Sequence, residues 1–425
     1  MQHVTMPFGK GELAFELPAA NKTTTVVPNH RDRLSDPDAA VRHALRSPIQ
    51  SPPLREIVQP GESVCIITSD ITRLSTRPDI ILPMLLQELN DCGIPDEQIF
   101  IMMACGDHRS QTPEEHRKLV GDRVYGRVRI YDHNAKDEAN LVYLGATRRG
   151  TPVWLNKLVH AADRIIITGG LSHHSFAGYG GGRKALLPGV AGYQTIQANH
   201  SLVVRKAPGE VTGPGAIVGN PLAADLMEAA YMAGPDFLIN NVTNEHNEVV
   251  AVVAGEMEAA WLEGVRICDS MFTIALEQPA DLVIASCGGY PKDMQLYQSM
   301  KGLENAAKAV RDGGTIILIS ECSDGPGHPE FVEAFKLGGL AAVGASLQER
   351  YTIQKYVCYF VTEILERAAV ILVSSLPDDV VKAVGMIPAH SPAEALALAG
   401  ARAPHAAETI LIPYSMVTFP VPPRR

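Results

Sequence analysis

The chain alternates short apolar runs with longer amphipathic stretches, and this order restricts its fold more than any other feature of the sequence. Residues 63–68 and 98–104 have the composition of buried strands, whereas 79–92 and 113–120 have the periodicity of helices. Such alternation is typical of an α/β fold with a parallel sheet. The 425 residues exceed the roughly 250 to 300 that one hydrophobic core serves, so we predict two domains.

A second series of alternating elements begins at the apolar run 282–286, after a predicted helix over 256–273. We place the boundary between residues 272 and 273, which gives an N-terminal domain of residues 1–272 and a C-terminal domain of residues 273–425. Each domain should be a sheet with flanking helices, and we expect the active site in the cleft between them. Residues before about 60 form a polar, proline-marked segment, and helical periodicity continues over 347–368.

Charge and cysteine content restrict the binding partners and the cellular compartment that we predict for the chain. Its 37 basic and 47 acidic residues give a net charge of -10, and the basic residues are scattered, so no nucleic-acid footprint is predicted. The seven cysteines are odd in number and lie mostly in apolar runs, as buried thiols of a reducing compartment do. Neither a signal peptide nor a membrane span is predicted, which favours the cytoplasm. The oligomeric state stays open.

Four polar clusters come directly after predicted strands. They are Asp70-Ile71-Thr72-Arg73, Gly106-Asp107-His108-Arg109, Ser172-His173-His174 and Gly289-Tyr290-Pro291-Lys292-Asp293. Ligands of open α/β sheets bind beyond the carboxyl ends of the strands. The sequence therefore predicts that these four clusters meet at one site.

A glycine-rich segment, Gly178–Gly182, precedes Arg183 and Lys184. It is not a P-loop, because Ala185 stands where the magnesium-binding hydroxyl would be. The GxGxxA pattern is a weak sign of a dinucleotide site, and Pro188 interrupts the helix that such a site requires. Backbone amides with the two cations can hold a phosphate or another anion, and a flexible surface loop is the plainer alternative.

The remaining polar candidates are ambiguous when each is considered alone. His108 and His174 have the side chain best suited to proton transfer at neutral pH, although a lone histidine is more often a hydrogen-bonding structural group. His200 could ligate a metal only with other donors, and otherwise it is a polar helix residue. Arg73 could bind a carboxylate or simply be solvated. Tyr297 and Lys301 share one helix face, which an ordinary amphipathic surface would also explain.

Taken together, these residues resemble the lactate racemase family, whose members use a nickel-pincer nucleotide. The resemblance spans residues 69 to 301. Its motifs are Asp70-x-Thr72-Arg73, Gly106-x-His108-Arg109, Ser172-His173-His174, Phe176-Ala177-Gly178, Gly181-Gly182-Arg183-Lys184, Pro188-Gly189, Asn199-His200, Gly288-Gly289-Tyr290-Pro291 and Tyr297-Gln298-x-x-Lys301.

The resemblance implies a role for each matching residue. Lys184 would carry the cofactor, Ni(II) pyridinium-3,5-bisthiocarboxylic acid mononucleotide, through a thioamide, and His200 would be the protein's nickel ligand. His108 and His174 would be acid/base groups on opposite faces of the substrate. The other implied cofactor-binding residues are Asp70, Thr72, Gly181, Gly182 and Arg183. The implied substrate-binding residues are Arg73, Tyr297, Gln298 and Lys301. The N-terminal domain would bind the cofactor, and the C-terminal domain would close over the substrate.

The implied reaction is racemisation of a small 2-hydroxy acid, lactate or a related short-chain acid. It proceeds by hydride transfer to and from the cofactor through a 2-keto acid, with cofactor-synthesis machinery as a partner. One alternative is epimerisation of a larger hydroxy acid such as an aldonate. Two others are a non-catalytic nucleotide- or anion-binding protein and an NAD-linked dehydrogenase. Leu74 replaces the proline that commonly follows the motif arginine in this family, which leaves the identity of the hydroxy acid open.

Overall fold

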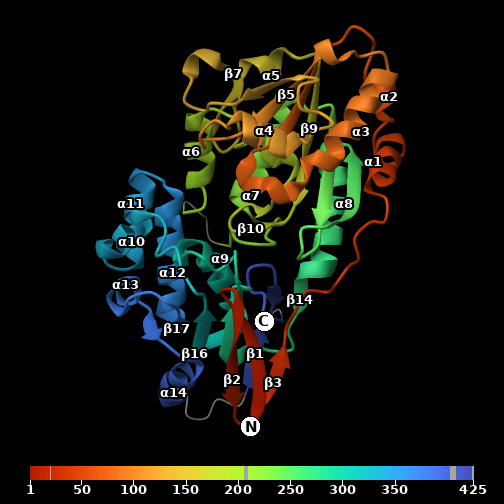
Figure 1. The fold of residues 1–425 in the computed structure, drawn as a ribbon. Coiled ribbons are helices and arrows are strands. Elements are labelled where there is room, and N and C mark those ends of the chain that lie inside the picture. The colour runs from red at the N-terminus through yellow and green to blue at the C-terminus, as the bar shows by residue number, and fades with distance from the viewer. Residues whose placement is uncertain (20, 205–208, 403–407, 424–425) are drawn as a thin grey trace. The chain divides into compact units, whose positions relative to one another are not determined.

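The computed structural model describes residues 1–19, 21–204, 209–402 and 408–423 (Figure 1). Contacts divide the chain into two compact units. We call His30–Ser270 the continuous unit, and Met1–Asn29 together with Met271–Arg425 the discontinuous unit. Each is a mostly parallel sheet flanked by helices, which confirms the predicted α/β class.

The continuous unit is built on a six-stranded sheet of order β13-β12-β9-β4-β5-β6. All neighbours pair in parallel except β12 and β13, which are antiparallel. The strands are β4 (Val64–Ser69), β5 (Ile99–Ala104), β6 (Arg129–Asp132), β9 (Arg164–Leu171), β12 (Phe237–Thr243) and β13 (Val249–Gly255). Because β4, β5 and β9 run in one direction, the segments after Ser69, Ala104 and Leu171 leave the same edge of the sheet.

One face of this sheet is covered by α1 (Pro37–Arg46), α2 (Leu54–Ile57) and α3 (Pro78–Asp91), whose apolar residues share one core with the strands. Gly264 of α8 (Met257–Phe272) packs against Leu171 and Val253. The other elements are α4 (Pro113–Val120), β7 (Leu141–Ala146), β8 (Pro152–Asn156), α5 (Lys157–Ala161), β10 (His173–His174), β11 (Gly178–Tyr179), α6 (Tyr193–Ser201) and α7 (Pro221–Ala233).

The discontinuous unit has a wholly parallel six-stranded sheet of order β18-β17-β16-β15-β19-β3. Its strands are β3 (Lys22–Thr25), β15 (Ala280–Ser286), β16 (Val310–Ile319), β17 (Ala369–Val373), β18 (Ile387–Ala389) and β19 (Glu408–Ile412). The hairpin of β1 (Gln2–Phe8) and β2 (Gly11–Leu17) buries Met6, Phe15 and Leu17 against the sheet in one core with α14 (Pro392–Arg402).

The remaining elements of this unit are α9 (Leu296–Ala306), α10 (Pro329–Ala334), α11 (Leu340–Glu349), α12 (Ile353–Arg367), α13 (Asp378–Ala383), β14 (Thr273–Ala275) and β20 (Phe419–Val421). The helix predicted over 347–368 is two helices. Thr352 caps the second, since its hydroxyl accepts a hydrogen bond from the Lys355 amide at 3.3 Å. Of the helices that the structure describes, none combines the length and apolar character needed to cross a bilayer.

The predicted division into residues 1–272 and 273–425 differs from the observed grouping at the N-terminus. Residues 1–29 fold with the C-terminal unit, although the other break, at 270–271, lies near the predicted boundary. The physical reason is strand pairing: Lys22–Thr25 align in parallel with residues 408–411. The polar N-terminal segment thus contains three strands that its composition concealed.

Candidate active site

Asp70 and His108 form a hydrogen-bonded pair at the carboxyl edge of the continuous unit's sheet. Asp70 follows β4 and caps a short 3-10 helix, where its Oδ1 accepts hydrogen bonds from the Thr72 amide and hydroxyl at 3.2 and 2.6 Å. Its Oδ2 lies 2.5 Å from His108 Nδ1. An imidazole that donates from Nδ1 leaves Nε2 as the atom that can accept a proton. The pair therefore has the geometry of an oriented general base.

The pKa values of the two partners shift in opposite directions. The hydrogen bond to Asp70 raises the pKa of His108, against the opposing effect of burial. Burial acts to raise the pKa of Asp70, but the hydrogen bonds from His108 and Thr72 outweigh it, so the pKa of Asp70 falls below its usual value. Asp70 is 2% exposed whereas the His108 side chain is 47% exposed, so the imidazole is reachable and its carboxylate partner is not.

Gln111, which sequence reasoning missed, holds the two loops of this pair together. Its Oε1 accepts a hydrogen bond from the Ile71 amide at 3.0 Å, and its Nε2 donates to the Arg109 carbonyl at 3.1 Å. Its own amide donates to Asp132 Oδ2 at 2.9 Å. One side chain thus ties the segment after β4 to the segment after β5. A buried glutamine next to a helix-capping threonine gives no local signal for this role.

Phe176 brings together three of the predicted functional side chains. Its ring centroid lies 4.4 Å from that of His174 and 5.0 Å from that of His200, and Lys184 Nζ lies 5.4 Å from it. We call Phe176, His174, Lys184 and His200 the Phe176 cluster. It adjoins the His108 loop, because the Gly106 amide donates to the Gly189 carbonyl at 2.9 Å. The structure therefore unites segments that the sequence separates widely.

Both members of the Phe176 cluster to which the resemblance gives a role at the cofactor have lowered pKa values. Burial is the main cause that lowers the pKa of His200 to about 3, and the nearby Lys184 adds to it. Burial also lowers the pKa of Lys184 well below its ordinary value, and the positive charges of Arg73 and Arg183 lower it further. Neutral imidazole is the state that ligates metals, and a neutral amine is the nucleophilic state of lysine.

The position of His174 is fixed by its neighbours. Its Nδ1 accepts long hydrogen bonds, both 3.5 Å, from the amides of Phe176 and Ala177, which favours the tautomer that carries its proton on Nε2. Asn220 anchors Phe176 in turn, because its Nδ2 donates to the Phe176 carbonyl at 2.8 Å. Asn220 also caps α7, and an asparagine before a proline is a helix-start signal that could have identified it.

Gly181 and Gly182 pack against the protein itself. A Cβ added at Gly181 would come within 2.9 Å of Asn240 Nδ2, and one at Gly182 within 2.7 Å of Trp261 Cδ1. Both glycines have positive φ, 68° and 52°. They let the loop lie tightly on β12 and α8. The sequence left an anion-binding loop and a flexible surface loop as alternatives, and the partner residues on β12 and α8 gave no signal of this contact.

Arg183 is turned inward. It is 1% exposed, its guanidinium lies 3.8 Å from the Trp261 ring centroid, and its Nη2 donates to the Ala177 carbonyl at 2.9 Å. Burial lowers its pKa to about 9. In the part of the chain that the structure describes, its Nε and Nη1 have no hydrogen-bond partner. Arg183 therefore anchors the loop and places a fixed positive charge beside Lys184.

Comparison with known proteins identifies the family. The chain matches the lactate racemase N-terminal domain over residues 8–213 and the lactate racemase C-terminal domain over residues 275–418. The chain belongs to the lactate racemase family. Lactate racemases of Thermoanaerobacterium thermosaccharolyticum and Lactiplantibacillus plantarum are each 34% identical to it, over 79% and 78% of this chain and 78% and 77% of their own. As a member of this family the protein is an isomerase, as predicted.

Comparison with solved structures gives the same fold. The lactate racemase apoprotein of T. thermosaccharolyticum superposes with a TM-score of 0.88 at 30% identity, covering 99% of this chain and 100% of that one. A Thermotoga maritima protein shares the fold at a TM-score of 0.65 and 18% identity, covering 93% of this chain and 100% of its own. The fold of the family thus extends over nearly the whole chain.

The family motif after β4 departs from its common form at Leu74, which the structure places with the core. Leu74 packs against the apolar cluster beneath α3, whereas Arg73 is exposed. The unusual side chain therefore points into the protein interior.

The predicted substrate-binding residues of the discontinuous unit lie on α9. Lys301 Nζ donates to Gln298 Oε1 at 2.9 Å, and Lys301 is exposed. The Tyr297 ring instead packs edge-on against Phe331 of α10 at 5.5 Å. Burial raises the pKa of Tyr297 to about 12, which keeps the phenol protonated. Gln298 and Lys301 are thus accessible polar groups, and Tyr297 supports the helix from its partly buried side.

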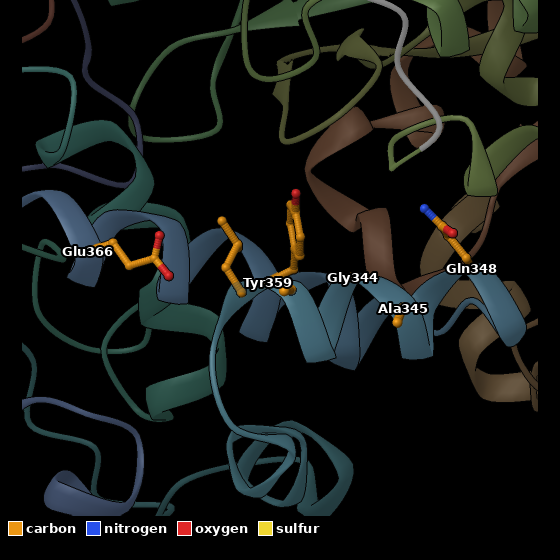
Figure 2. Close-up of a pocket in the computed structure, with 7 residues that line it drawn as sticks. Gly344, Ala345, Gln348, Tyr359 and Glu366 are labelled. Atoms are coloured by element: carbon orange, nitrogen blue, oxygen red, sulfur yellow. The ribbon is translucent and has the colours of Figure 1, made fainter.

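A separate open depression in the discontinuous unit lies between α11 and α12 (Figure 2). Its polar lining is Gln348, Tyr359 and Glu366, and the rest is small or apolar. None of the predicted site residues lines it. The predicted site residues lie elsewhere, on the strand ends, the glycine-rich loop, α6 and α9.

Proposed function

We propose that this chain interconverts the D and L forms of a small 2-hydroxy acid, lactate or a related short-chain acid, with a nickel-pincer nucleotide attached at Lys184. One observation carries the proposal: the Lys184 amine and the His200 imidazole lie around one ring, at 5.4 and 5.0 Å from the Phe176 centroid. The relatives named above are lactate racemases, which supports lactate as the first substrate to test.

The residues present fit this cofactor. Among the described residues no group of three or more His, Cys, Asp or Glu side chains could hold a metal ion. A cofactor that brings its own donors needs one protein ligand, and His200 is a buried neutral imidazole. Lys184 would be the tether, with Asp70, Thr72, Gly181, Gly182 and Arg183 shaping the surroundings. When bound, the cofactor would accept a hydride from the substrate carbon and return it.

The protein's own groups would move the hydroxyl proton and hold the substrate. His108, oriented by Asp70, offers Nε2 as an acceptor, while His174 offers a protonated Nε2. Opposite proton states at the two histidines suit a reaction that runs in either direction, with the roles exchanged on return. Arg73 would bind the carboxylate in bidentate fashion, and Gln298, Lys301 and Tyr297 of α9 would complete the substrate site.

The deciding experiment is expression of the full chain with and without the cofactor-synthesis genes, which supply the proposed partner. We expect a covalent adduct on Lys184, one bound nickel per chain and interconversion of D- and L-lactate only in the first case. Lys184→Arg should lose all three. Malate, longer 2-hydroxy acids and aldonates in the same chiral assay identify the preferred acid.

No adduct and no nickel in the co-expressed chain would contradict the proposal. Adduct and nickel without turnover of any 2-hydroxy acid would contradict racemisation alone. We also propose a cytoplasmic location, on the basis of the cysteine pattern in the sequence.

A further inference from the structure

Asp269 of α8 contacts both strands of the short antiparallel pair that carries His174. We call this pair, β10 with β11, the β10–β11 ribbon. Asp269 Oδ1 accepts a hydrogen bond from the Tyr179 hydroxyl at 2.6 Å and lies 3.1 Å from His173 Nε2. Tyr179 and His173 are paired across the ribbon, with ring centroids 4.8 Å apart. One carboxylate oxygen therefore bridges the two strands.

The His173 side chain is buried against α8. It is 1% exposed, whereas the Asp269 side chain is 38% exposed. His173 Nδ1 lies 3.8 Å from Sγ of Cys268, the residue before Asp269. An imidazole that donates from Nε2 to a carboxylate can accept a hydrogen bond from a thiol at Nδ1. The ring thus links β10 to two consecutive residues of α8.

The anchoring of His173 determines where His174 points. Successive side chains of a strand face opposite sides, so a His173 ring held against α8 directs His174 away from that helix. The contacts agree, because the His174 ring lies 4.4 Å from that of Phe176. The ribbon consists of two residue pairs, and so short a ladder is weak by itself. Anchors from outside the ribbon must therefore fix its orientation.

We propose that Asp269 is a positioning residue for His174. It acts through its two partners on the ribbon and so sets the direction in which His174 presents Nε2. The two proposed acid/base histidines are then supported in different ways: Asp70 bonds directly to the ring of His108, whereas Asp269 holds the strand that carries His174. The inference deepens the proposed function, because it rests on the proposed role of His174.

The first test measures hydrogen–deuterium exchange at C2 of each histidine ring in the full chain, expressed without cofactor. Tandem mass spectrometry of the peptides resolves His173 from His174. In Asp269→Ala the ribbon loses its bridge, so His174 should loosen from the amides that hold its Nδ1 and exchange several-fold faster than in the wild type.

Two other histidines are internal references. His108 and His133 should keep their wild-type rates in Asp269→Ala. His133 is 1% exposed and lies 2.9 Å from a backbone carbonyl, so it would exchange faster if the whole unit opened. Unchanged exchange at His174 would overturn the inference. Faster exchange at His133 as well as His174 would also overturn it, because Asp269 would then stabilise the unit rather than position one side chain.

Matched variants test the bridge itself. Asp269→Asn keeps an acceptor oxygen and should restore most of the wild-type behaviour. Tyr179→Phe removes one of the two contacts, so it should have a smaller effect alone and none in the Asp269→Ala background. Glu263→Ala is the control, since Glu263 is another partly exposed carboxylate of α8, paired with Arg266 at 2.7 Å. If Asp269→Ala does not fold, Tyr179→Phe decides by the same criterion.

The second test measures turnover of the nickel-loaded chain. Asp269→Ala should keep the adduct on Lys184 and one nickel per chain, while kcat for lactate falls by about 10- to 100-fold, as a small misplacement of a reacting group can cause. KM should change less, because the proposed carboxylate-binding Arg73 is untouched. An unchanged kcat in Asp269→Ala would overturn the inference and leave the proposed function intact. A wild-type chain that loads no nickel would overturn the proposed function, although the exchange measurement would still report how Asp269 holds His174.

Discussion

Two regions of the continuous unit shift the pKa of histidine in opposite directions. At the strand ends, His108 lies 2.5 Å from a buried carboxylate, which raises its pKa. In the Phe176 cluster, His200 lies against an aromatic ring near a lysine, and its pKa falls to about 3. The pKa of the same side chain is thus raised in one place and lowered in the other. The hydrogen bond to a carboxylate raises the pKa of His108, whereas burial lowers the pKa of His200.

Replacing one histidine at a time should give the largest difference between the two regions, in nickel content and in turnover. We expect His200→Ala to abolish both nickel binding and racemase activity. His108→Ala should keep one nickel per chain while turnover falls by about 10²- to 10⁴-fold, the usual contribution of a general acid or base. Nickel content and chiral analysis of the product, measured on the same samples, separate the two outcomes. Loss of nickel from His108→Ala would show that the regions are not distinct.

Removal of the carboxylate should move His108 toward the neutral state. In Asp70→Asn the pKa of His108 falls, because its raised value comes first from the hydrogen bond to Asp70. In the direction where His108 accepts the proton, the ascending limb of kcat/KM against pH should therefore shift to lower pH. Turnover at the optimum should fall by about 10²-fold as the orienting bond is lost. Thr72→Val, which keeps the carboxylate, is the control and should shift the limb less.

The Phe176 cluster depends on a tightly seated glycine loop, so a methyl group beneath it should be costly. Gly182→Ala combines a positive φ with a 2.7 Å approach to Trp261, and we expect a loss of about 2 to 5 kcal/mol in the free energy of unfolding. Gly126→Ala is the matched control, with φ of 84° and open space around it, and should lose about 1 to 2 kcal/mol. Urea unfolding measures both. Equal losses would mean that the contact with Trp261 is unimportant.

The smallest expected effect concerns Leu74, which follows Arg73 but belongs to the core. Leu74→Ala should lower stability by about 1 to 2 kcal/mol, through lost burial of a partly buried side chain. The order of preference among lactate, malate and longer hydroxy acids should stay the same. A changed order in the chiral assay would place this position in the substrate site after all.

Of the four strand-end clusters predicted to meet, those at Asp70 and His108 lie together, because parallel strands carry their following residues to one edge. The carboxylate of Asp70 faces His108. The role of Asp70 at the cofactor, which the resemblance implied, stays a prediction. The order of helices and strands from residue 63 onward followed the apolar periodicity. Local patterns carry this information because burial repeats along each element.

Contacts between residues that are distant in the sequence could not be predicted from such local patterns. Trp261 and Asn240 lie far along the chain from Gly182 and Gly181, and nothing near them signals the contact. The strand β3, Lys-Thr-Thr-Thr, lies at the sheet edge with its side chains mostly exposed, so it shows no apolar pattern. Its pairing uses backbone hydrogen bonds and an ion pair between Lys22 and Glu408 at 3.6 Å, and the composition of the segment signals neither.

The pairing of β3 with β19 also sets the order in which the protein can be completed during synthesis. Residues 22–25 leave the ribosome early and meet residues 408–411 only when β19 emerges. At about 5 to 20 residues per second, β3 waits on the order of a minute without its partner. His30–Ser270 can fold in that interval. Nascent chains stalled before residue 408 should therefore expose β3 to chaperones while the candidate active-site loops are already folded.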